Sequence, residues 1–280
     1  MIEKQQYNIM YMKKIFQWSM AAALICGASV FTACSSNDDN PIKPDEPAAE
    51  AVHLTQQYSV STLANGDTMA ISIMDYIWED GLLRTTHSYL NMPTYHSVSE
   101  SDNFYVYDDD GNCIEEHYVS DNRHHDYYLT YEGGLMTSGI EMSNDEIVGK
   151  VTITGHTADG QIQAITSERL LTGTISKYEI TWENGDMTAY TVYVNRPGEE
   201  EEIQNVTIGY DDYPNISTGM PLASDVFDPQ MIASTASVHN WDIGEERFYA
   251  NGRVVKAIKK NTALTGVIYY TYSDGTTGKE

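Results

Sequence analysis

Beyond its first fifty residues the chain alternates Tyr, Thr, Ile and Val with polar residues. Residues 177–183 are the clearest case. One face of that predicted strand carries Tyr178, Ile180 and Trp182, and the other carries polar side chains. Asn184–Gly185 follows, and this pair favours a tight hairpin because both residues tolerate a positive φ. The chain then returns through a second expected strand rich in Tyr, Thr and Val.

Turn signals of the same kind recur along the chain. They are Asn65–Gly66, Asp80–Gly81, Asp110–Gly111, Gly133–Gly134, Asp159–Gly160, Asn184–Gly185, Asn251–Gly252 and Asp274–Gly275. From Gly111 to Gly185 they are spaced by roughly 22 to 27 residues, which fits two strands and two turns per unit. One segment departs from this pattern, since Asp228–Pro229 is a helix start signal and predicts a short helix over 229–236.

These patterns predict an all-β fold. We expect an antiparallel hairpin meander that forms a curved sheet or a barrel-like structure, with at most one or two short helices. Residues 51–280 are enough for a single β domain of this kind.

Three turn segments carry a resemblance. Tyr107–Asn112, Tyr131–Leu135 and Phe248–Val254 resemble the Tyr-Asp-x-x-Gly hairpins of Rhs-type repeat proteins. The region as a whole is similar to lipoproteins of gut Gram-negative anaerobes that carry a domain of unknown function with a porin-like fold. The resemblance implies a curved antiparallel sheet or barrel-like meander, and it implies no activity.

The N-terminus has the layout of a secretory signal. Lys13 and Lys14 precede a mostly apolar run that ends at Ala33–Cys34. This segment resembles the lipobox of bacterial lipoproteins, with Phe31 in place of the usual Leu. The resemblance implies that residues 1–33 are a signal peptide and that Cys34 is lipidated.

A transmembrane anchor is the alternative, because the run is about long enough to span a bilayer. Polar residues dilute the run, however, and no basic cluster follows it. Met12 is the expected true start of translation. Residues 34–50 contain three prolines among polar residues and predict a flexible tether. By the same resemblance, Ser35 and the acidic run Asn37–Asp39 imply an outer-membrane lipoprotein exposed at the cell surface.

The chain is strongly acidic. Its net charge is −25, and loss of residues 1–33, with three Lys and one Glu, makes it −27. Such a surface repels phosphate backbones, so no nucleic-acid partner is expected. With Cys26 in the leader and Cys34 lipidated, Cys113 is the one remaining cysteine, and the fold is expected to form without a disulfide.

Candidate catalytic and metal sites are weak in this sequence. Asp108–Gly111 lacks the first ligand of a calcium loop and favours a tight turn. His117, His124 and His125 have no recognisable zinc spacing, and a polar turn over 120–126 is the preferred interpretation. Cys113 has no motif of a nucleophile. Chance pairs among the many carboxylates leave a glycosidase open. We therefore expect no catalytic residue, no metal site and no cofactor.

The tyrosines are the more informative feature. Tyr270 and Tyr272 share a strand face with Ile268, which predicts a core role for both. Tyr105 and Tyr107 share one face of another strand, and Phe104 and Val106 share the opposite face. Because Phe and Val need no polar partner, we expect that pair inside.

That assignment leaves Tyr105 and Tyr107 exposed, as residues on which a sugar ring stacks. Cross-strand packing in the core is the alternative. The leading hypothesis is a non-catalytic surface lipoprotein, held in the membrane by its lipid, that binds glycan or an envelope protein. A surface glycosidase and a purely structural envelope protein are the alternatives.

Overall fold

The computed structural model describes residues 51–280 except 122, 243, 261–263 and 280, with the side chains of Pro229 and Gln230 left out. The predicted leader, Cys34 and the tether lie outside the described residues. Fifteen strands form one large antiparallel sheet, and two more form a small one. The described residues hold one short helix and two 3-10 turns, so the prediction of an all-β antiparallel meander is confirmed.

The elements follow one another closely along the chain. The large sheet consists of β1 (Leu54–Leu63), β2 (Thr68–Glu79), β3 (Leu82–Met92), β4 (Ser97–Tyr107), β5 (Cys113–Ser120), β6 (Arg123–Glu132), β7 (Leu135–Ser143), β8 (Glu146–His156), β9 (Ile162–Arg169), β10 (Thr174–Glu183), β11 (Asp186–Asn195), β12 (Glu202–Thr207), β15 (Glu246–Ala250), β16 (Arg253–Lys260) and β17 (Leu264–Tyr272). The remaining elements are η1 (Pro93–Tyr95), β13 (Tyr210–Pro214), η2 (Ser224–Phe227), α2 (Pro229–Ala236) and β14 (His239–Trp241).

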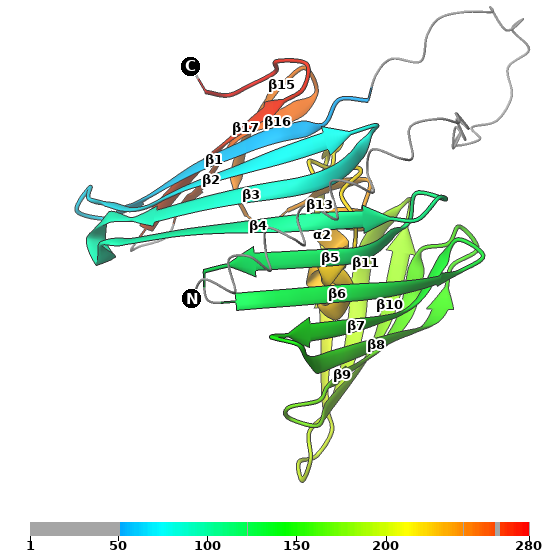
Figure 1. Ribbon diagram of the computed structural model, residues 1–280. Coiled ribbons are helices and arrows are strands. Elements are labelled where there is room, and N and C mark those ends of the chain that lie inside the picture. Colours follow the sequence, from blue (N-terminus) through cyan, green and yellow to red (C-terminus); the bar gives the residue numbers. More distant parts are fainter. Residues whose placement is uncertain (1–50, 122, 243, 261–263, 280) are drawn as a thin grey trace, which may run out of the picture. The chain divides into compact units, whose positions relative to one another are not determined.

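The sheet is a meander with one long return. Strands β1 to β12 lie side by side in chain order, and β17, β16 and β15 follow on the other side of β1. Figure 1 shows the consequence: the blue β1 lies beside the red end of the chain. The sheet does not close, because β12 and β15 remain as its two edges.

The hairpin predicted at Asn184–Gly185 forms as expected. Both residues have positive φ, 53° and 88°, which matches the twist of the flanking strands β10 and β11. Ile180 is buried, and Tyr178 and Trp182 pack against the same core, so the predicted strand face is confirmed. The Trp182 indole N–H donates to the Ile162 carbonyl oxygen at 2.8 Å, which gives its polar atom a partner.

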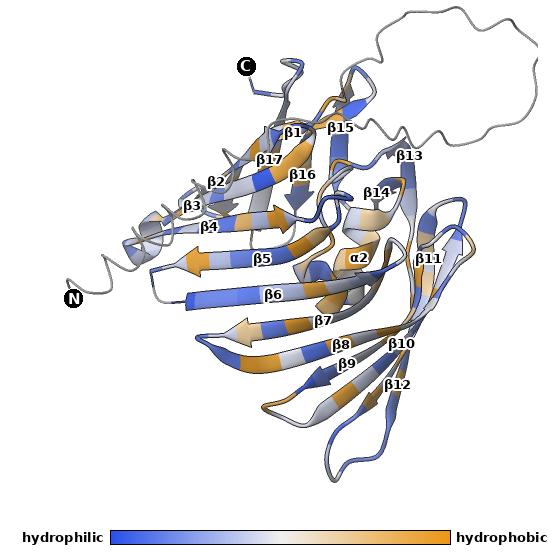
Figure 2. Ribbon diagram, turned by 45° about the vertical axis from the view of Figure 1, so that its right-hand side comes forward, coloured by the Kyte–Doolittle hydropathy of each residue, from blue (hydrophilic) through white to orange (hydrophobic). Residues whose placement is uncertain are grey.

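Residues 208–245, here called the bridging segment, connect the two edge regions of the sheet. The segment contains β13, η2, α2 and β14, and the helix predicted over 229–236 is confirmed as α2. Figure 2 shows α2 within the curve of the sheet, with apolar residues along it. The face that α2 covers is the inner face, and the opposite one is the outer face. No helix among the described residues is long and apolar enough to cross a membrane.

Hydrogen bonds attach the bridging segment to β11 at one side of the opening. The Tyr210 hydroxyl donates to the Met187 carbonyl oxygen at 2.8 Å. The His239 backbone N–H donates to Asp186 Oδ1 at 2.9 Å, and the His239 ring lies 2.7 Å from the other oxygen of that carboxylate. These partners are 23 and 53 residues apart in the chain, so the contacts are tertiary.

A partly buried ion pair attaches the same segment to β15 at the other side. Arg247 Nη1 lies 2.8 Å from Asp211 Oδ2, which also accepts the Tyr249 hydroxyl at 2.8 Å. The Tyr213 and Tyr249 rings stack at 3.7 Å between centroids. The bridging segment therefore holds both ends of the open sheet through side chains.

Two apolar clusters form the core. The larger one lies between β5–β11 and the bridging segment, where Val226, Ile232 and Ala233 are fully buried. The smaller one joins Leu54 and Val254 to Tyr270 and Tyr272, whose side chains are at most 5% exposed. The predicted core role of these two tyrosines is confirmed.

The Asn–Gly turns give a matched test of this packing. Gly185 and Gly252 both follow an Asn and have positive φ, so alanine at either costs about 1–2 kcal/mol of stability. A Cβ at Gly252 meets nothing within 4 Å, whereas one at Gly185 lies 2.5 Å from Val238 Cγ2 of the bridging segment. We expect Gly185→Ala to lose about 1–3 kcal/mol more than Gly252→Ala in urea unfolding. Equal losses would contradict the close approach of Val238.

Candidate functional site

Tyr105 and Tyr107 face the core, so the predicted assignment of faces on this strand is wrong. Both rings pack against the larger apolar cluster on the inner face. The Tyr107 hydroxyl donates to the Leu83 carbonyl oxygen at 2.8 Å, and burial raises the pKa of both phenols. Tyrosine can occupy an inner position because its one polar atom finds a backbone acceptor. A ligand role for this pair stays a prediction, on rings that are partly buried.

A different set of aromatic residues lies across the outer face. Tyr58 pairs with Tyr269 on one side and with Ile73 on the other, and the row continues to Tyr89. In the opposite direction Tyr269 pairs with Lys256, and Lys256 pairs with Phe248. We call this set the aromatic row: Phe248, Lys256, Tyr269, Tyr58, Ile73 and Tyr89. It crosses six strands, which corresponds to roughly 24 Å at about 4.8 Å per strand.

The row lies on the face opposite the core, as the alternation along β17 shows. Tyr270 is buried in the smaller cluster, and its neighbour Tyr269 therefore points to the other side of the sheet. Tyr58 and Tyr269 are 6.3 Å apart between ring centroids, and both are half-buried by their neighbours. Phe248, at the end of the row, is 39% exposed. The C-terminal segment reaches this row through Lys279, whose ammonium lies over the Tyr58 ring.

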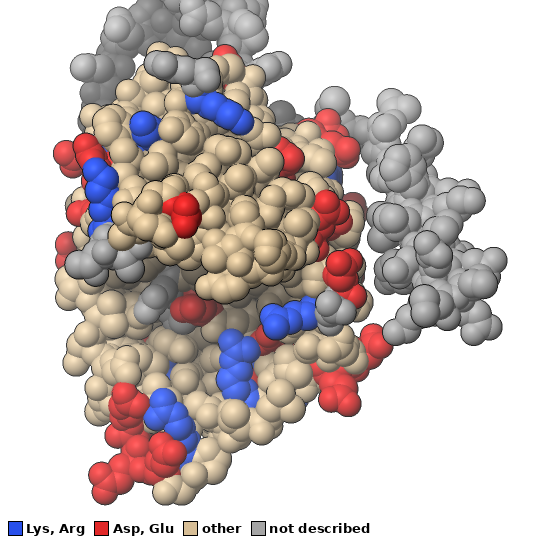
Figure 3. All heavy atoms as spheres, turned by 90° about the vertical axis from the view of Figure 1, so that its left-hand side faces the viewer, with Lys and Arg blue, Asp and Glu red and all other residues tan. Residues whose placement is uncertain are grey.

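Two lysines lie over the aromatic rings. Lys256 Nζ is 5.3 Å from the centroids of both Phe248 and Tyr269, and Lys279 Nζ is 4.1 Å from that of Tyr58. These cation–π contacts hold ammonium donors close to the ring faces. Cations are few in this chain, and on the face in Figure 3 Asp and Glu lie mainly around a broad uncharged area.

Polar side chains form a parallel row on the outer face, one step along each strand from the aromatic row. This polar row consists of Thr271, Gln56, Asp75, His87 and Asp102. Gln56 Nε2 donates to Asp75 Oδ1 at 2.7 Å, and His87 Nδ1 lies 2.8 Å from Asp102 Oδ1. Amide, imidazole and carboxylate groups thus border the rings along one side.

The other border of the aromatic row is aliphatic. Its members are Ile258, Val267, Val60 and Ile71. Meanwhile the inner-face positions of β1–β4 include Ser59, Ser72, Ser88, Ser99 and Ser101. The outer face of this part of the sheet thus carries two adjoining rows that are largely apolar, and the inner face carries hydroxyls together with apolar residues such as Met74 and Leu90. An outward apolar surface of this kind marks an interaction site in soluble proteins.

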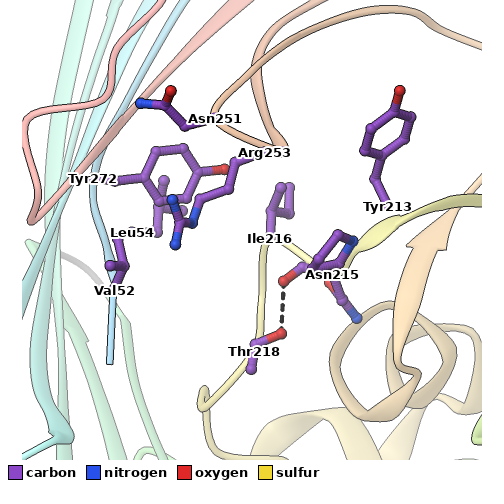
Figure 4. A pocket seen from close by; sticks show the side chains of 11 residues that line it. Val52, Leu54, Tyr213, Asn215, Ile216, Thr218, Asn251, Arg253 and Tyr272 are labelled. Atoms are coloured by element: carbon purple, nitrogen blue, oxygen red, sulfur yellow. Dashed lines mark hydrogen bonds between the residues drawn. The ribbon is translucent and has the colours of Figure 1, made fainter. Parts of the chain in front are cut away.

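A pocket of about 440 Å³ lies where the bridging segment meets β1 and β16. Figure 4 shows Arg253 in front of the Tyr272 ring, opposite Asn215 and Ile216. Its polar groups already have partners. Asn215 Nδ2 donates to two backbone carbonyls, the Tyr272 hydroxyl donates to the Val254 carbonyl oxygen, and Arg253 lies 3.2 Å from Asp274. These contacts favour a structural role for the pocket walls.

Two buried carboxyl groups on the inner face bear on the glycosidase alternative. Glu116 accepts the Ser224 backbone N–H at 2.8 Å, and Asp225 accepts a hydrogen bond from the Thr235 hydroxyl. Burial raises the pKa of Glu116, and it raises the pKa of Asp225 to about 6. Glu116 of β5 thus holds the bridging segment to the sheet, and Asp225 joins η2 to α2 within that segment, which accounts for both groups without a substrate.

The remaining candidates fall at separate places. Asp108–Gly111 forms the β4–β5 turn, where Asp108 Oδ1 accepts the N–H groups of Asp110 and Asn112. Cys113 is buried on the inner face, and burial raises its thiol pKa to about 12. The polar turn expected over 120–126 is shorter than predicted, because His124 and His125 belong to β6.

The aromatic row is not predicted from the sequence, because it joins residues that are far apart in the chain. Tyr58 and Tyr269 are neighbours only through the pairing of β1 with β17. A weak signal exists in the sequence: Tyr269 alternates with the core residue Tyr270, so it must face the opposite side. No protein-family model matches the chain, and no curated protein matches it either. The functional proposal therefore depends on the geometry of the described residues.

The raised pKa of Asp225 gives a test of the buried carboxyl groups. Folding raises the pKa of this carboxyl above its unfolded value of about 3.9. Below that pH the group is protonated in both states and does not lower the free energy of unfolding. Above its folded pKa it lowers the free energy of unfolding the most. We expect the free energy of unfolding to fall between about pH 4 and pH 6.5, and to fall less in Asp225→Asn. Urea unfolding across this range measures the effect, with the exposed Asp109→Asn as control. Equal pH slopes in Asp225→Asn and the unmodified protein would contradict the assignment.

Proposed function

We propose that this protein is a non-catalytic surface lipoprotein that binds a glycan chain along the aromatic row. The row carries the proposal, because it places several rings in one line with hydrogen-bonding side chains beside it. A pyranose has an apolar face that stacks on an aromatic ring, and hydroxyls at its edge that bond to polar side chains. The row provides the first contact and the polar row provides the second.

The dimensions of the surface favour an extended ligand. The row is roughly 24 Å long by strand spacing, so it suits several successive sugar rings and not a single one. A sugar on Tyr58 takes the place of the Lys279 ammonium, whose exposed side chain can move aside and donate to a hydroxyl. An envelope protein is the alternative partner, and the binding experiment below separates the two.

We further propose that the domain is held at the outer membrane by a lipid on Cys34. The Ala33–Cys34 pair at the end of an apolar leader supports the anchor, and the proline-containing residues 34–50 support a tether. An extended binding surface is useful at the end of such a tether, because a glycan outside the cell can then reach it.

The glycan proposal is tested with a matched pair of substitutions on neighbouring positions of β1 and β17. Tyr58→Ala combined with Tyr269→Ala removes two outer rings, and we expect binding at least roughly tenfold weaker, a loss of about 1.4 kcal/mol. Tyr270→Ala removes a buried ring, and we expect it to cost about 3–5 kcal/mol of stability. The measurement is a glycan array with the soluble chain from Ser35 onward, followed by calorimetry on the best polysaccharide.

The outcomes of that experiment are distinct. Weakened binding by a double variant that keeps its unfolding midpoint supports the row. Full affinity in a folded double variant contradicts it. Absence of binding to every glycan also contradicts the proposal and favours the envelope-protein alternative. Release of shorter sugars during the assay would overturn the non-catalytic assignment.

The anchor is tested with Cys34→Ser and with Cys113→Ser as control. We expect Cys34→Ser to abolish incorporation of labelled palmitate, because its thiol is the proposed acceptor. Cys113 is buried in the fold, so Cys113→Ser is expected to leave labelling intact. A Cys34→Ser variant that remains membrane-bound as a shortened chain would rule out the lipid anchor. Protease added to intact cells then distinguishes surface exposure from a periplasmic location.

A further inference from the structure

Four side chains with metal-binding groups gather on the outer face of β5 and β6. His117 and Asp126 are direct cross-strand partners. His124 lies two positions before Asp126 and Glu115 lies two positions before His117, so all four share one face. The sequence alone does not show this, because the pairing of the two strands brings the residues together.

The distances within the group are short. Asp126 Oδ1 lies 2.7 Å from His117 Nδ1 and 3.0 Å from His124 Nε2. The candidate ligand atoms of His117, His124 and Asp126 all lie within 4.8 Å of one another. The Asp126 side chain is 8% exposed and that of His117 is 14% exposed, whereas that of His124 is 46% exposed. The group is therefore buried on one side and open to solvent on the other.

The second nitrogen of His117 also faces a carboxylate. Its Nε2 lies 2.8 Å from Glu115 Oε2. A neutral imidazole has a single N–H, so it can donate to only one of its two carboxylate neighbours. When the Nε2–H donates to Glu115, Nδ1 carries the lone pair. That lone pair then points to the space that Asp126 and His124 also face. Metal-binding histidines commonly have this arrangement, with a carboxylate on the far nitrogen.

We propose that His117 Nδ1, His124 Nε2 and the Asp126 carboxylate bind a zinc-class divalent cation, with Glu115 as a positioning residue. Two imidazole nitrogens and one carboxylate suit Zn²⁺ better than Ca²⁺ or Mg²⁺, which prefer oxygen ligands. Ligands about 2.0–2.1 Å from zinc in a tetrahedron are about 3.3 Å apart, so the present separations need to open by a few tenths of an ångström. The exposed His124 can supply that movement, and the solvent side leaves a fourth position for water.

The site has a defined place relative to the polar row. Asp102 of that row pairs with Val119, and Val119 pairs with His124. A cation here fastens β5 to β6 at the end of the polar row, and it does so whether or not a glycan binds. The second outer-face His–Asp pair, His87 with Asp102, has one imidazole and one carboxylate and provides the matched control.

The test is calorimetric titration of the full chain in detergent solution with Zn²⁺ alone, followed by Co²⁺ spectroscopy. We expect one high-affinity equivalent and a Co²⁺ absorption typical of a tetrahedral site. His124→Ala removes an exposed ligand and is expected to weaken this equivalent at least tenfold. Glu115→Gln is expected to weaken it about 10- to 100-fold, and His87→Ala is expected to leave it unchanged.

Other results overturn the assignment. Several weak equivalents that persist in His124→Ala would show only diffuse binding to an acidic surface. A tight equivalent that His124→Ala does not affect would place the metal elsewhere. Loss of binding in His87→Ala to the same extent as in His124→Ala would also contradict the site. Far-ultraviolet circular dichroism of each variant confirms that the β structure is retained, and Asp126→Asn gives a second ligand variant if needed.

Discussion

Burial of the bridging segment against the inner face is the interaction on which the rest of this structure depends. Val226, Ile232 and Ala233 of that segment are fully buried against β-strand residues such as Val151 and Met187. A single curved sheet cannot bury one of its faces by itself, and without the segment these apolar side chains would face water. The segment also contacts β11, next to one edge strand, through Asp186, and the other edge strand, β15, through Asp211.

This constraint decides where a ligand can bind. The segment occupies the inner face over β5–β11, where the Glu116 carboxylate accepts the Ser224 N–H and Asp225 joins η2 to α2 within the segment. In β1–β3 and β15–β17 apolar residues lie on the outer face as well as in the smaller inner cluster. Tyr58 and Tyr269 lie on the outer face, with Gln56 and Asp75 beside them. This outer row is the surface on which we propose that a glycan binds.

Local features of the fold were predictable from sequence, and the faces and distant pairings were not. Asn184–Gly185 and the helix over 229–236 depend on backbone preferences of a few neighbouring residues, and both form as expected. Tyr105 and Tyr107 were assigned to the wrong face because Phe104 and Val106 alternate with them equally well. The hydroxyl of Tyr107 finds its acceptor, the Leu83 carbonyl, 24 residues away, which no local rule reveals.

The candidate sites have the same origin. The aromatic row needs β1 to pair with β17, and the histidine group needs the register of β5 against β6. Sequence spacing argued against zinc, because His117 and His124 belong to no known ligand motif. Both histidines lie next to Asp126 because β5 pairs with β6. Ligand-spacing rules for helices or loops do not describe such cross-strand pairing.

Hydrogen–deuterium exchange of the soluble protein tests most directly whether the bridging segment is packed against the inner face. The account predicts that amides of α2 exchange as slowly as those of β9–β11, since both belong to the same buried cluster. The turn around η1 is exposed and is predicted to exchange fastest. Exchange in α2 as fast as in that turn would show that the segment is not packed against the sheet, and would contradict the account.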